Sequence, residues 1–514
     1  MDIFQPFIRF FNTILGAWYG QEFWLTRFVF LRALGCIYFV AFLGVFNQYK
    51  GLFGHRGLLP ANQFLQRIHE TYGSAFKGFW KLPSLFWIHI SDQFMAILAF
   101  IGIIISAAVV LGLSNGVSLF ILWVLYMSFV HVGQVFYGYG WESLLLETGF
   151  LAIFLYPFFN LSLFPQHHPP PKLIMFLLIW VLFRNMFGAG LIKLRGDSCW
   201  RDLTCLNYHF ETQPLPNPLS PFFHRLPNWM LKGGVLFNHF VELIVPFGLL
   251  LTAPFRIVAG VFTALFQLVL IVSGNLSWLN WLTLVICIPC FDDRIWRMIL
   301  PSKLLGMVPN SPVFFSVYSF PNQLILVTLG LLITVLSIKP IQNLFSSRQS
   351  MNRSYDPFHL VNSYGAFGSV GKERFECVIK GTNNVQEDNW QEYDFIAKPG
   401  QLTRPHPVIA PYQPRLDWQI WFAAMGTYQH NPWLVHLVYK LLKNDDVILP
   451  LIYKNPFAKK PPKFVKIDLY RYEFSDSNQS SKVYWKRSFV RSYLPPLSMD
   501  NPSLIHYLQN QGWL

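Results

Sequence analysis

Long runs of apolar residues set the strongest constraint on how this chain can fold. A helix that crosses a bilayer needs about 20 mostly apolar residues. Such runs recur through the first two thirds of the sequence, at 28–46, 94–113, 119–136, 144–161, 173–191, 235–251, 257–272 and 324–338, with a shorter run at 276–291. The sequence therefore predicts a polytopic α-helical membrane protein with eight or nine spans.

The overall composition agrees with this interpretation. Hydrophobic residues make up 53% of the chain and charged residues only 13%, whereas soluble domains contain about 25% charged residues. The formal net charge is +14. In a membrane protein, an excess of basic residues favours contact with anionic lipid headgroups. Because the sequence contains no nucleic-acid-binding motif, we expect membrane lipids as partners and no nucleic acid.

The composition changes after residue 338. Residues 341–514 contain no further apolar run of spanning length, and their number is that of an ordinary soluble domain. Short strand-like patches at 375–379 and 393–396 predict a hairpin, and alternating residues at 469–474 and 483–489 predict a second strand pair. We therefore expect a multi-span domain at 1–340, followed by a C-terminal domain of mixed α/β or β-rich structure at 341–514.

The most unusual charged residues follow the run 173–191. Lys193 comes directly after the string GAGLI, and further charged side chains follow at Arg195, Asp197, Arg201 and Asp202. An ionisable group at membrane depth costs roughly 2.5–3.5 kcal/mol on insertion scales, so it needs a partner or a function. One hypothesis is a mutual ion-pair network within this cluster. The other is a partly desolvated Lys193 that acts as a base, nucleophile or binding group.

Two carboxylates lie near the start of the run 144–161. Glu142 lies at its boundary and Glu147 lies deeper. An unpaired carboxylate at such a depth would be neutral or would attract a cation. The candidate partners of Glu147 are Lys193 and Arg184.

Neither a metal site nor a cofactor is predicted. His239 and Glu242 are three residues apart and share a helix face. No second such pair appears on another span, so we favour a polar contact between helices over a metal site. Cys287 and Cys290 also lack a second ligand pair at zinc spacing.

Two features depend on the side of the membrane that they face. Cys199 and Cys205 form a disulfide if their loop faces an oxidising compartment, and are free thiols otherwise. Sequons for N-glycosylation are used only on the secretory side of the membrane. The sequence contains four of them, which begin at Asn160, Asn275, Asn352 and Asn478. Apolar neighbours make Asn275 a poor acceptor.

Motifs of the common soluble enzymes are missing from the sequence. It contains no glycine-rich nucleotide loop, no GxSxG nucleophile elbow and no HExxH zinc motif. Kinase and soluble-type hydrolase chemistry is therefore unsupported.

Many long strings of this chain, in the same order, resemble those of the lipase maturation factor family. They include WLTRFVFLRALG, HRGLLP, YGWESLLLETGF, GAGLIKLRGDSCWRDLTC, HFETQPLPNP, SGNLSWLNWLT, SSRQSMN, VNSYGAFGSV and PYQPRLDWQIWFAA. The resemblance extends over nearly the whole chain. It implies a multi-pass membrane protein of the endoplasmic reticulum that helps secreted lipases reach their active dimeric form. A prokaryotic relative would instead lie in the bacterial inner membrane.

The same resemblance implies that the C-terminal region, roughly 346–514, faces the lumen and engages secreted lipases or other client proteins. Aromatic side chains of this region are candidates for shielding apolar surface of an unassembled client, and each is otherwise part of the domain's own core. The candidates are Tyr364, Phe367, Trp418, Trp421 and Phe422.

A shorter resemblance implies an alternative function. The segment AGLIKL with a following tryptophan is similar to the lysine-bearing segment of vitamin K-dependent gamma-carboxylases and their bacterial membrane relatives. On this resemblance Lys193 would be a catalytic base, and Glu142 and Glu147 would lie on a neighbouring polar helix. The protein would then be a membrane enzyme rather than a maturation factor, which is the interpretation that we favour less.

Overall fold

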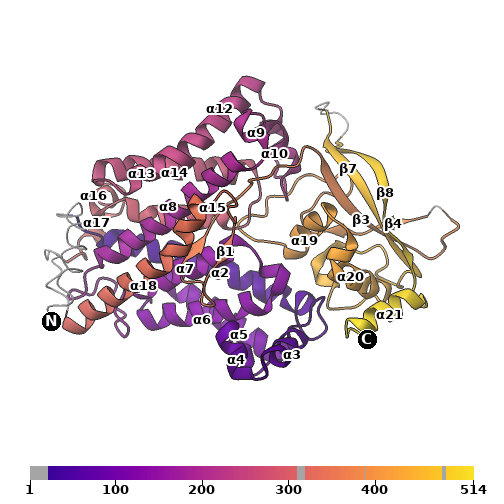
Figure 1. Ribbon diagram of the computed structural model, residues 1–514, viewed down its shortest axis with the longest axis horizontal. Coiled ribbons are helices and arrows are strands. Elements are labelled where there is room, and N and C mark those ends of the chain that lie inside the picture. Colours follow the sequence, from indigo (N-terminus) through magenta and orange to yellow (C-terminus); the bar gives the residue numbers. More distant parts are fainter. Residues whose placement is uncertain (1–20, 310–318, 388, 477–481) are drawn as a thin grey trace.

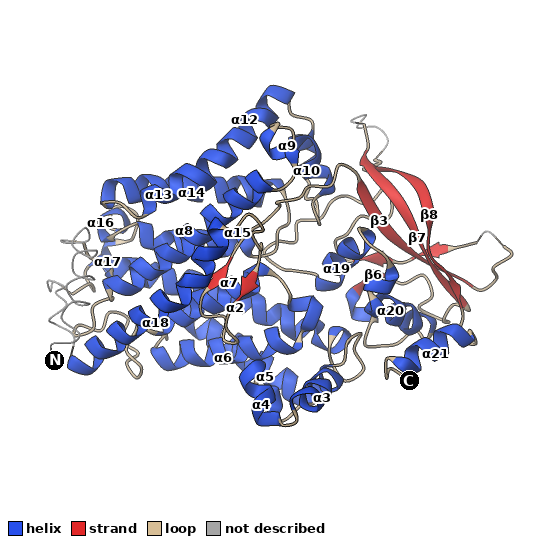
Figure 2. Ribbon diagram, in the orientation of Figure 1, coloured by secondary structure: helices blue, strands red, loops and turns tan. Residues whose placement is uncertain are grey.

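The computed structural model describes residues 21–309, 319–387, 389–476 and 482–514. Figure 1 shows an elongated molecule with a helical bundle at one end and a C-terminal part at the other. Figure 2 shows that the large β-sheet lies entirely in the C-terminal part. The predicted fold class, a polytopic helical membrane protein with a C-terminal domain that contains strands, is confirmed.

Each predicted apolar run overlaps a helix or two consecutive helices, and residues 154–161 of the run 144–161 lie beyond the end of its helix. Six helical segments are long and apolar enough to cross a membrane: α2 (Trp24–Leu52), α5 (Asp92–Leu111), α8 (Lys172–Arg195), α12 to α13 (Asn228–Leu249), α14 (Ala253–Ser273) and α18 (Phe320–Phe345). The other three runs form shorter helices, namely α6 (Gly116–Val132), α7 (Gly140–Ile153), and α15 with η5 (Leu279–Cys290).

Helix α8 lies at the centre of the bundle. It packs against α7, α13, α15 and α18, and most of its apolar residues are buried. A helix that is apolar on all sides is typical of such a central position.

Shorter helices connect the spans: α3 (Ala61–Tyr72), α4 (Ala75–Lys81), η2 (Leu85–Trp87), η3 (Gln134–Tyr137), α9 (Ser198–Arg201), α10 (Leu206–Thr212), α11 (Ser220–His224), α16 (Asp293–Trp296) and α17 (Ser302–Leu305).

The start of α2 is capped by a residue distant in sequence. The Asp293 carboxylate accepts hydrogen bonds from the backbone N–H groups of Trp24 and Leu25, both at 2.9 Å, and of Thr26 at 3.1 Å. The first N–H groups of a helix have no partner within the helix. Asp293 therefore joins α16 to the first span of the bundle.

The C-terminal part contains an antiparallel four-stranded sheet in the order β4-β3-β7-β8, with helices α19 and α20 packed against β3 and β7. The elements are β3 (Arg374–Thr382), β4 (Gln391–Glu392), β7 (Phe464–Phe474), β8 (Trp485–Leu497), α19 (Arg415–Ala424), α20 (Pro432–Leu442) and α21 (Pro502–Asn510). Smaller elements are β1 (Arg353–Ser354), β2 (Asn362–Ser363), β5 (Asp394–Phe395), β6 (Ile452–Lys454), η7 (Tyr428–His430) and η8 (Leu449–Leu451).

Both predicted strand pairs form, although the second strand of one is displaced. Strands β7 and β8 pair along their length, as the alternating residues near the C-terminus predict. Strand β3 pairs antiparallel with β4 across the polar loop between them, and the Tyr393 N–H donates to the Ile379 carbonyl oxygen at 3.0 Å, so the predicted hairpin is confirmed. Its second strand was predicted at 393–396, whereas β4 is Gln391–Glu392 and Asp394–Phe395 pairs with β6.

The chain that follows α18 returns to the helical bundle before it enters the sheet. Strand β2 contacts α7, α8 and α18, and Figure 2 shows the small β1–β2 pair against the helices. Irregular backbone at membrane depth is tolerated only where protein or water satisfies its polar groups. The helical and C-terminal parts therefore share an interface built from this segment. The division at 340 and 341 stays a prediction.

Candidate functional site

Lys193 lies in the last turn of α8, where its side chain is buried. Its Nζ atom donates hydrogen bonds to Oε1 and Oε2 of Glu242, at 2.5 and 2.6 Å, and lies 3.3 Å from Oδ1 of Asn238. Asp197 and Glu147, the partners that the sequence suggested for Lys193, are not its partners. The charge of Lys193 is therefore balanced by a carboxylate on another span.

A π-helical turn, η4 (Phe240–Ile244), carries Glu242 between α12 and α13. This turn packs directly against α8. The close approach depends on Gly190, because a Cβ atom there would lie 2.7 Å from Cδ2 of Leu243 and 3.0 Å from Cβ of Glu242. A small residue at a helix contact allows two helices to approach closely. Gly190 and the π-turn together bring the carboxylate to Lys193.

Substitution of Gly190 with Ala is expected to lower the stability of the protein by about 1–3 kcal/mol, the usual cost of overpacking. The added methyl group must displace η4 from α8 and lengthen the contact between Lys193 and Glu242. Thermal unfolding of the purified protein in detergent measures the effect.

The matched control is Gly233→Ala, in the exposed part of α12, where an added Cβ has nothing within 4 Å. Alanine is favoured over glycine within a helix by about 1 kcal/mol, so the control should be neutral or stabilising. Equal unfolding temperatures for the two variants would contradict the packing role of Gly190.

Aromatic and imidazole groups complete the surroundings of Lys193. Its Nζ atom lies 5.2 Å from the centre of the Trp200 ring, in a cation–π contact. His239 Nε2 lies 3.0 Å from the carbonyl oxygen of Trp200, so His239 and Glu242 serve different partners. Burial, and then the charge of Lys193, lowers the pKa of His209 to about 4. His209 is therefore neutral beside the ion pair at neutral pH.

The structure contains a disulfide between Cys199 and Cys205. Both cysteines are buried and form a small apolar cluster with Trp200, Val235 and Val370. This cluster packs the loop after α8 against α12 and against the start of the C-terminal part. In the described part of the chain, no group of three His, Cys, Asp or Glu residues is arranged to hold a metal ion.

The charged residues that follow Lys193 do not form the predicted ion-pair network. Arg195 contacts Oε1 of Gln349 at 2.6 Å, and the Asp197 carboxylate accepts a hydrogen bond from the Val370 N–H at 2.7 Å. Arg201 donates to backbone carbonyl groups, and Asp202 is exposed. Among the described residues, these four side chains make no ion pair with one another or with Lys193. The prediction failed because backbone and amide groups nearby are better placed than the charges.

Glu147 pairs with Arg184, which is one of its two predicted partners. Its carboxylate also accepts hydrogen bonds from the Tyr364 hydroxyl at 2.5 Å and from the backbone N–H and side chain of Asn362, both at 3.0 Å. Arg184 donates in turn to the Asn362 carbonyl oxygen at 2.5 Å. All four side chains are buried. This network attaches the segment after α18 to α7 and α8.

Glu142 is paired with a residue that the sequence did not suggest. Arg415, at the start of α19, donates from Nη1 to Oε1 of Glu142 at 2.8 Å and to the Phe136 carbonyl oxygen at 2.7 Å. The Tyr126 hydroxyl donates a further hydrogen bond to Glu142. Because Arg415 is fully buried, this pair joins the C-terminal part to the helical bundle. The sequence does contain a signal that Arg415 needs a buried carboxylate, because Arg415 is a charged residue in the largely apolar string PRLDWQIWFAA.

The candidate aromatic residues differ in their exposure. Tyr364 and Trp418 are buried, so they belong to the interior of this structure rather than to a surface. Phe367 and Trp421 are half-buried, and Phe422 is 41% exposed. Of the five candidates, Phe422 at the end of α19 is the exposed one.

Contacts along one side of α19 fix its exposed end. Besides the pair made by Arg415, the Gln419 amide donates to the Val135 carbonyl oxygen at 2.6 Å and to the Tyr139 hydroxyl at 2.9 Å. The last turn then presents Phe422, and Met425 follows it with 58% of its surface exposed. An apolar pair held on an anchored helix can contact a partner at a low cost in conformational entropy.

The sequence matches two family models, one in each part of the fold. Residues 25–298 match the model described as lipase maturation factor transmembrane domain. Residues 360–495 match the model described as lipase maturation factor C-terminal domain. The two matches include Lys193, Glu242 and the end of α19.

Curated relatives match nearly the whole chain. "Lipase maturation factor 1" of Homo sapiens is 44% identical over 96% of this chain and 90% of the human protein. The Mus musculus protein of that name is likewise 44% identical over 96% of this chain and 90% of its own length. "Lipase maturation factor 2" of Xenopus tropicalis is 29% identical over 95% of this chain and 84% of its own length. No solved structure matches the chain.

Proposed function

This chain belongs to the lipase maturation factor family, and from that premise we propose that it is a membrane-embedded factor that helps secreted lipases to fold and assemble into active dimers. The observation that carries this proposal is the similarity to lipase maturation factor 1 over 96% of the chain. A multi-pass membrane protein with a large C-terminal domain suits this function, because it keeps a client-binding surface beside the membrane.

We place this activity at the membrane of the endoplasmic reticulum, with the C-terminal domain in the lumen. The disulfide between Cys199 and Cys205 favours an oxidising compartment for its loop. That loop lies on the same side as the C-terminal domain, because Asp197 contacts Val370 and the Glu211 carboxylate accepts the Phe474 N–H at 2.7 Å.

Of the four sequons, that of Asn352 lies on an exposed segment, which suits glycosylation on the same side. Asn275 is buried and donates to the Pro407 carbonyl oxygen at 2.8 Å, so its side chain is engaged. The sequon of Asn478 lies outside the described residues.

The mechanism that we propose is the shielding of apolar surface on an unassembled client. A lipase subunit that has not yet dimerised exposes its future interface, and exposed apolar patches promote aggregation. Phe422 and Met425, at the end of the anchored helix α19, are apolar like the exposed interface of such a subunit, and can therefore cover part of it. Aromatic and methionine side chains are enriched in the centres of protein interfaces.

The carboxylase-like alternative has less support. The family models and the relatives named above are lipase maturation factors and do not favour a carboxylase. In addition, Glu242 engages Lys193 Nζ with both carboxylate oxygens. A base needs a nitrogen that is free to accept a proton, so this geometry supports an ion pair that stabilises the fold.

Complementation tests the function directly. In cells that lack a lipase maturation factor and express a secreted dimeric lipase, the full-length chain should restore secretion of active lipase. The measurement is lipase activity per amount of secreted lipase protein. No recovery, with the chain present in the membrane and folded, would contradict the proposed function.

A double variant tests the proposed contact. Phe422→Ala with Met425→Ala should lower active secreted lipase by roughly 5- to 30-fold, the change expected for the loss of 1–2 kcal/mol of binding. Val385→Ala removes an exposed apolar side chain from the loop between β3 and β4, and should leave lipase activity unchanged. Equal activity of the double variant and the control, at equal amounts of folded protein, would exclude this surface.

A further inference from the structure

Two groups of exposed aromatic side chains flank the helical bundle. One lies on α4 and the loop after it, and the other lies on α11 and the start of α12. Figure 1 shows α4 and the tip of α12 on opposite sides of the bundle, at similar positions along the long axis. Both lie at the end of the bundle nearer to the C-terminal part.

The first group lies between two spans. Helix α2 ends at Leu52 and α5 begins at Asp92, so α3 and α4 are held at one end of the bundle. Phe76 is 72% exposed, Trp80 is 52% exposed, and Ile88, just before α5, is 80% exposed. Large apolar side chains exposed together to this degree are rare on a surface that faces water.

The second group lies where another span begins. Trp229 is 74% exposed in the first turn of α12, and Met230 and Phe222 beside it are also exposed. Since Asn228–Leu249 is long and apolar enough to cross a membrane, Trp229 lies at one end of a spanning segment. Tryptophan is enriched at the boundary between lipid and water.

The charges around both groups are mainly basic. Residues 61–81 contain Arg67, Lys77 and Lys81 against a single acidic residue, Glu70. Lys232 lies one turn after Trp229 on α12, and it is exposed. Basic side chains at a bilayer surface extend their charged ends into the headgroup region, where every phospholipid carries a phosphate.

We propose that these two groups rest in the headgroup region of a single phospholipid leaflet, the one that adjoins the C-terminal domain. The aromatic rings then lie at the boundary of the acyl chains, and the basic side chains reach the lipid phosphates. Because the groups flank the bundle on opposite sides, they fix both the depth of the protein in the bilayer and its tilt.

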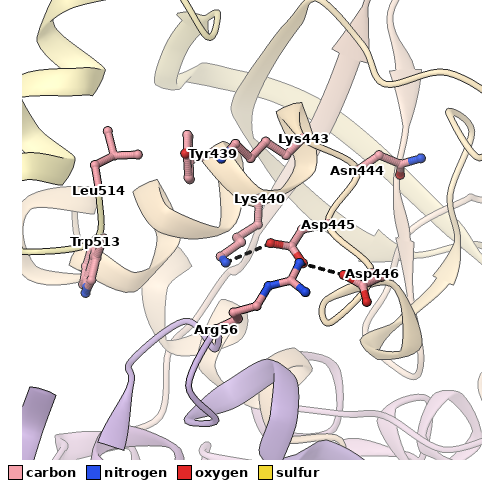
Figure 3. A pocket seen from close by; sticks show the side chains of 9 residues that line it. All are labelled: Arg56, Tyr439, Lys440, Lys443, Asn444, Asp445, Asp446, Trp513 and Leu514. Atoms are coloured by element: carbon pink, nitrogen blue, oxygen red, sulfur yellow. Dashed lines mark hydrogen bonds and ion pairs between the residues drawn. The ribbon is translucent and has the colours of Figure 1, made fainter. Parts of the chain in front are cut away.

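Helix α3, which packs against α4, connects the first group to the C-terminal domain. Gln63 of α3 donates to the Gly512 carbonyl oxygen at 2.6 Å. Arg56, in the loop before α3, pairs with Asp445 and Asp446, each at 2.7 Å. Figure 3 shows Arg56 directed towards these carboxylates. All three side chains line a cavity of about 470 Å³ where the two parts meet. The segment between α2 and α5, which carries the first group, is therefore tied to the C-terminal domain.

Site-directed spin labelling of the full chain tests the proposal. Among the described cysteines, Cys36 is the exposed free thiol, so Cys36→Ala provides the background. Phe76→Cys and Trp229→Cys, each labelled with a nitroxide, are reconstituted as single chains in phosphatidylcholine–phosphatidylserine nanodiscs. Collisions with oxygen and with a water-soluble nickel chelate then report the depth of each label.

Val385→Cys is the matched control, because it is also exposed and apolar but lies on the loop between β3 and β4. We expect the labels at 76 and 229 to favour oxygen over nickel, at similar depths, and the label at 385 to favour nickel. Nickel accessibility at 76 and 229 equal to that at 385 would overturn the proposal. If the labels at 76 and 229 are shielded from nickel only when each disc holds two chains, the surface contacts a second copy and the proposal is wrong. If they are shielded only when lipase is added, the surface contacts the client and the proposal is equally wrong.

Discussion

Arg184→Met should destabilise the protein by about 3–5 kcal/mol, the usual result of removing one partner from a buried ion pair. The substitution leaves the Glu147 carboxylate buried without its cation. It also removes the donor to the Asn362 carbonyl oxygen. The segment after α18 should then detach from α7 and α8. Thermal unfolding in detergent and the amount of folded protein in the membrane measure the loss.

The control for this prediction is the double variant Arg184→Met with Glu147→Gln. It removes both charges and keeps side chains of similar size, so most of the lost stability should return. The remaining deficit reports the hydrogen bonds that Glu147 accepts from Tyr364 and Asn362. If Arg184→Met alone unfolds at the temperature of the unchanged protein, the pair does not support the fold.

Lys193→Met should have an effect of similar size, about 3–5 kcal/mol, because Glu242 loses its only ion-pair partner among the described residues. The loss of the cation should also weaken the contact between α8 and η4. We expect less folded protein in the membrane and, in consequence, less active secreted lipase. Unfolding temperature and lipase activity should therefore fall together.

The double variant Lys193→Met with Glu242→Gln separates a structural role from a chemical one. If the pair only stabilises the fold, the double variant should recover both stability and lipase maturation. If Lys193 is a base, the double variant should fold normally and remain inactive. A folded, inactive double variant would therefore contradict the structural interpretation and restore the enzyme alternative.

The spans could be predicted from the sequence because their signal is local. A helix hydrogen-bonds its own backbone, so an apolar run of sufficient length is enough to define it in a bilayer. The runs at 119–136, 144–161 and 276–291 were predicted as spans, yet their helices are shorter than the six long ones. The composition of these three runs does not show where each helix ends. The glycine and polar residues found at the helix ends also occur inside the longer spans.

The strand partners were less predictable than the helices. The β7–β8 pair follows from alternation in two adjacent segments. The hairpin of β3 and β4 likewise follows from neighbouring segments, but the pairing of Asp394–Phe395 with β6 does not, because β6 comes much later in the chain. Pairing between distant strands depends on how the whole domain packs.

The candidate site shows the same division between local and distant information. Lys193, Glu142 and Glu147 were identified as charges that need partners, and each has a buried partner in the structure. Only one of the three pairs, Glu147 with Arg184, was among the predicted candidates. The spacing of Glu242 and His239 predicts that they share a helix face, whereas in the structure the π-helical turn brings Glu242 to Lys193 on α8. The sequence does not point to Arg415 as the partner of Glu142, because Arg415 lies far along the chain in the C-terminal part.

By itself, the sequence determined the membrane class, the positions of the apolar helices, the family and the residues whose charges required compensation. These follow from hydrophobicity and motifs, which are properties of neighbouring residues. Only the tertiary structure decided which carboxylate meets which cation, which aromatic residues are buried, and how the C-terminal part attaches to the bundle. The physical reason is that a buried charge costs free energy wherever it lies, whereas the geometry that offsets this cost joins residues far apart in the chain.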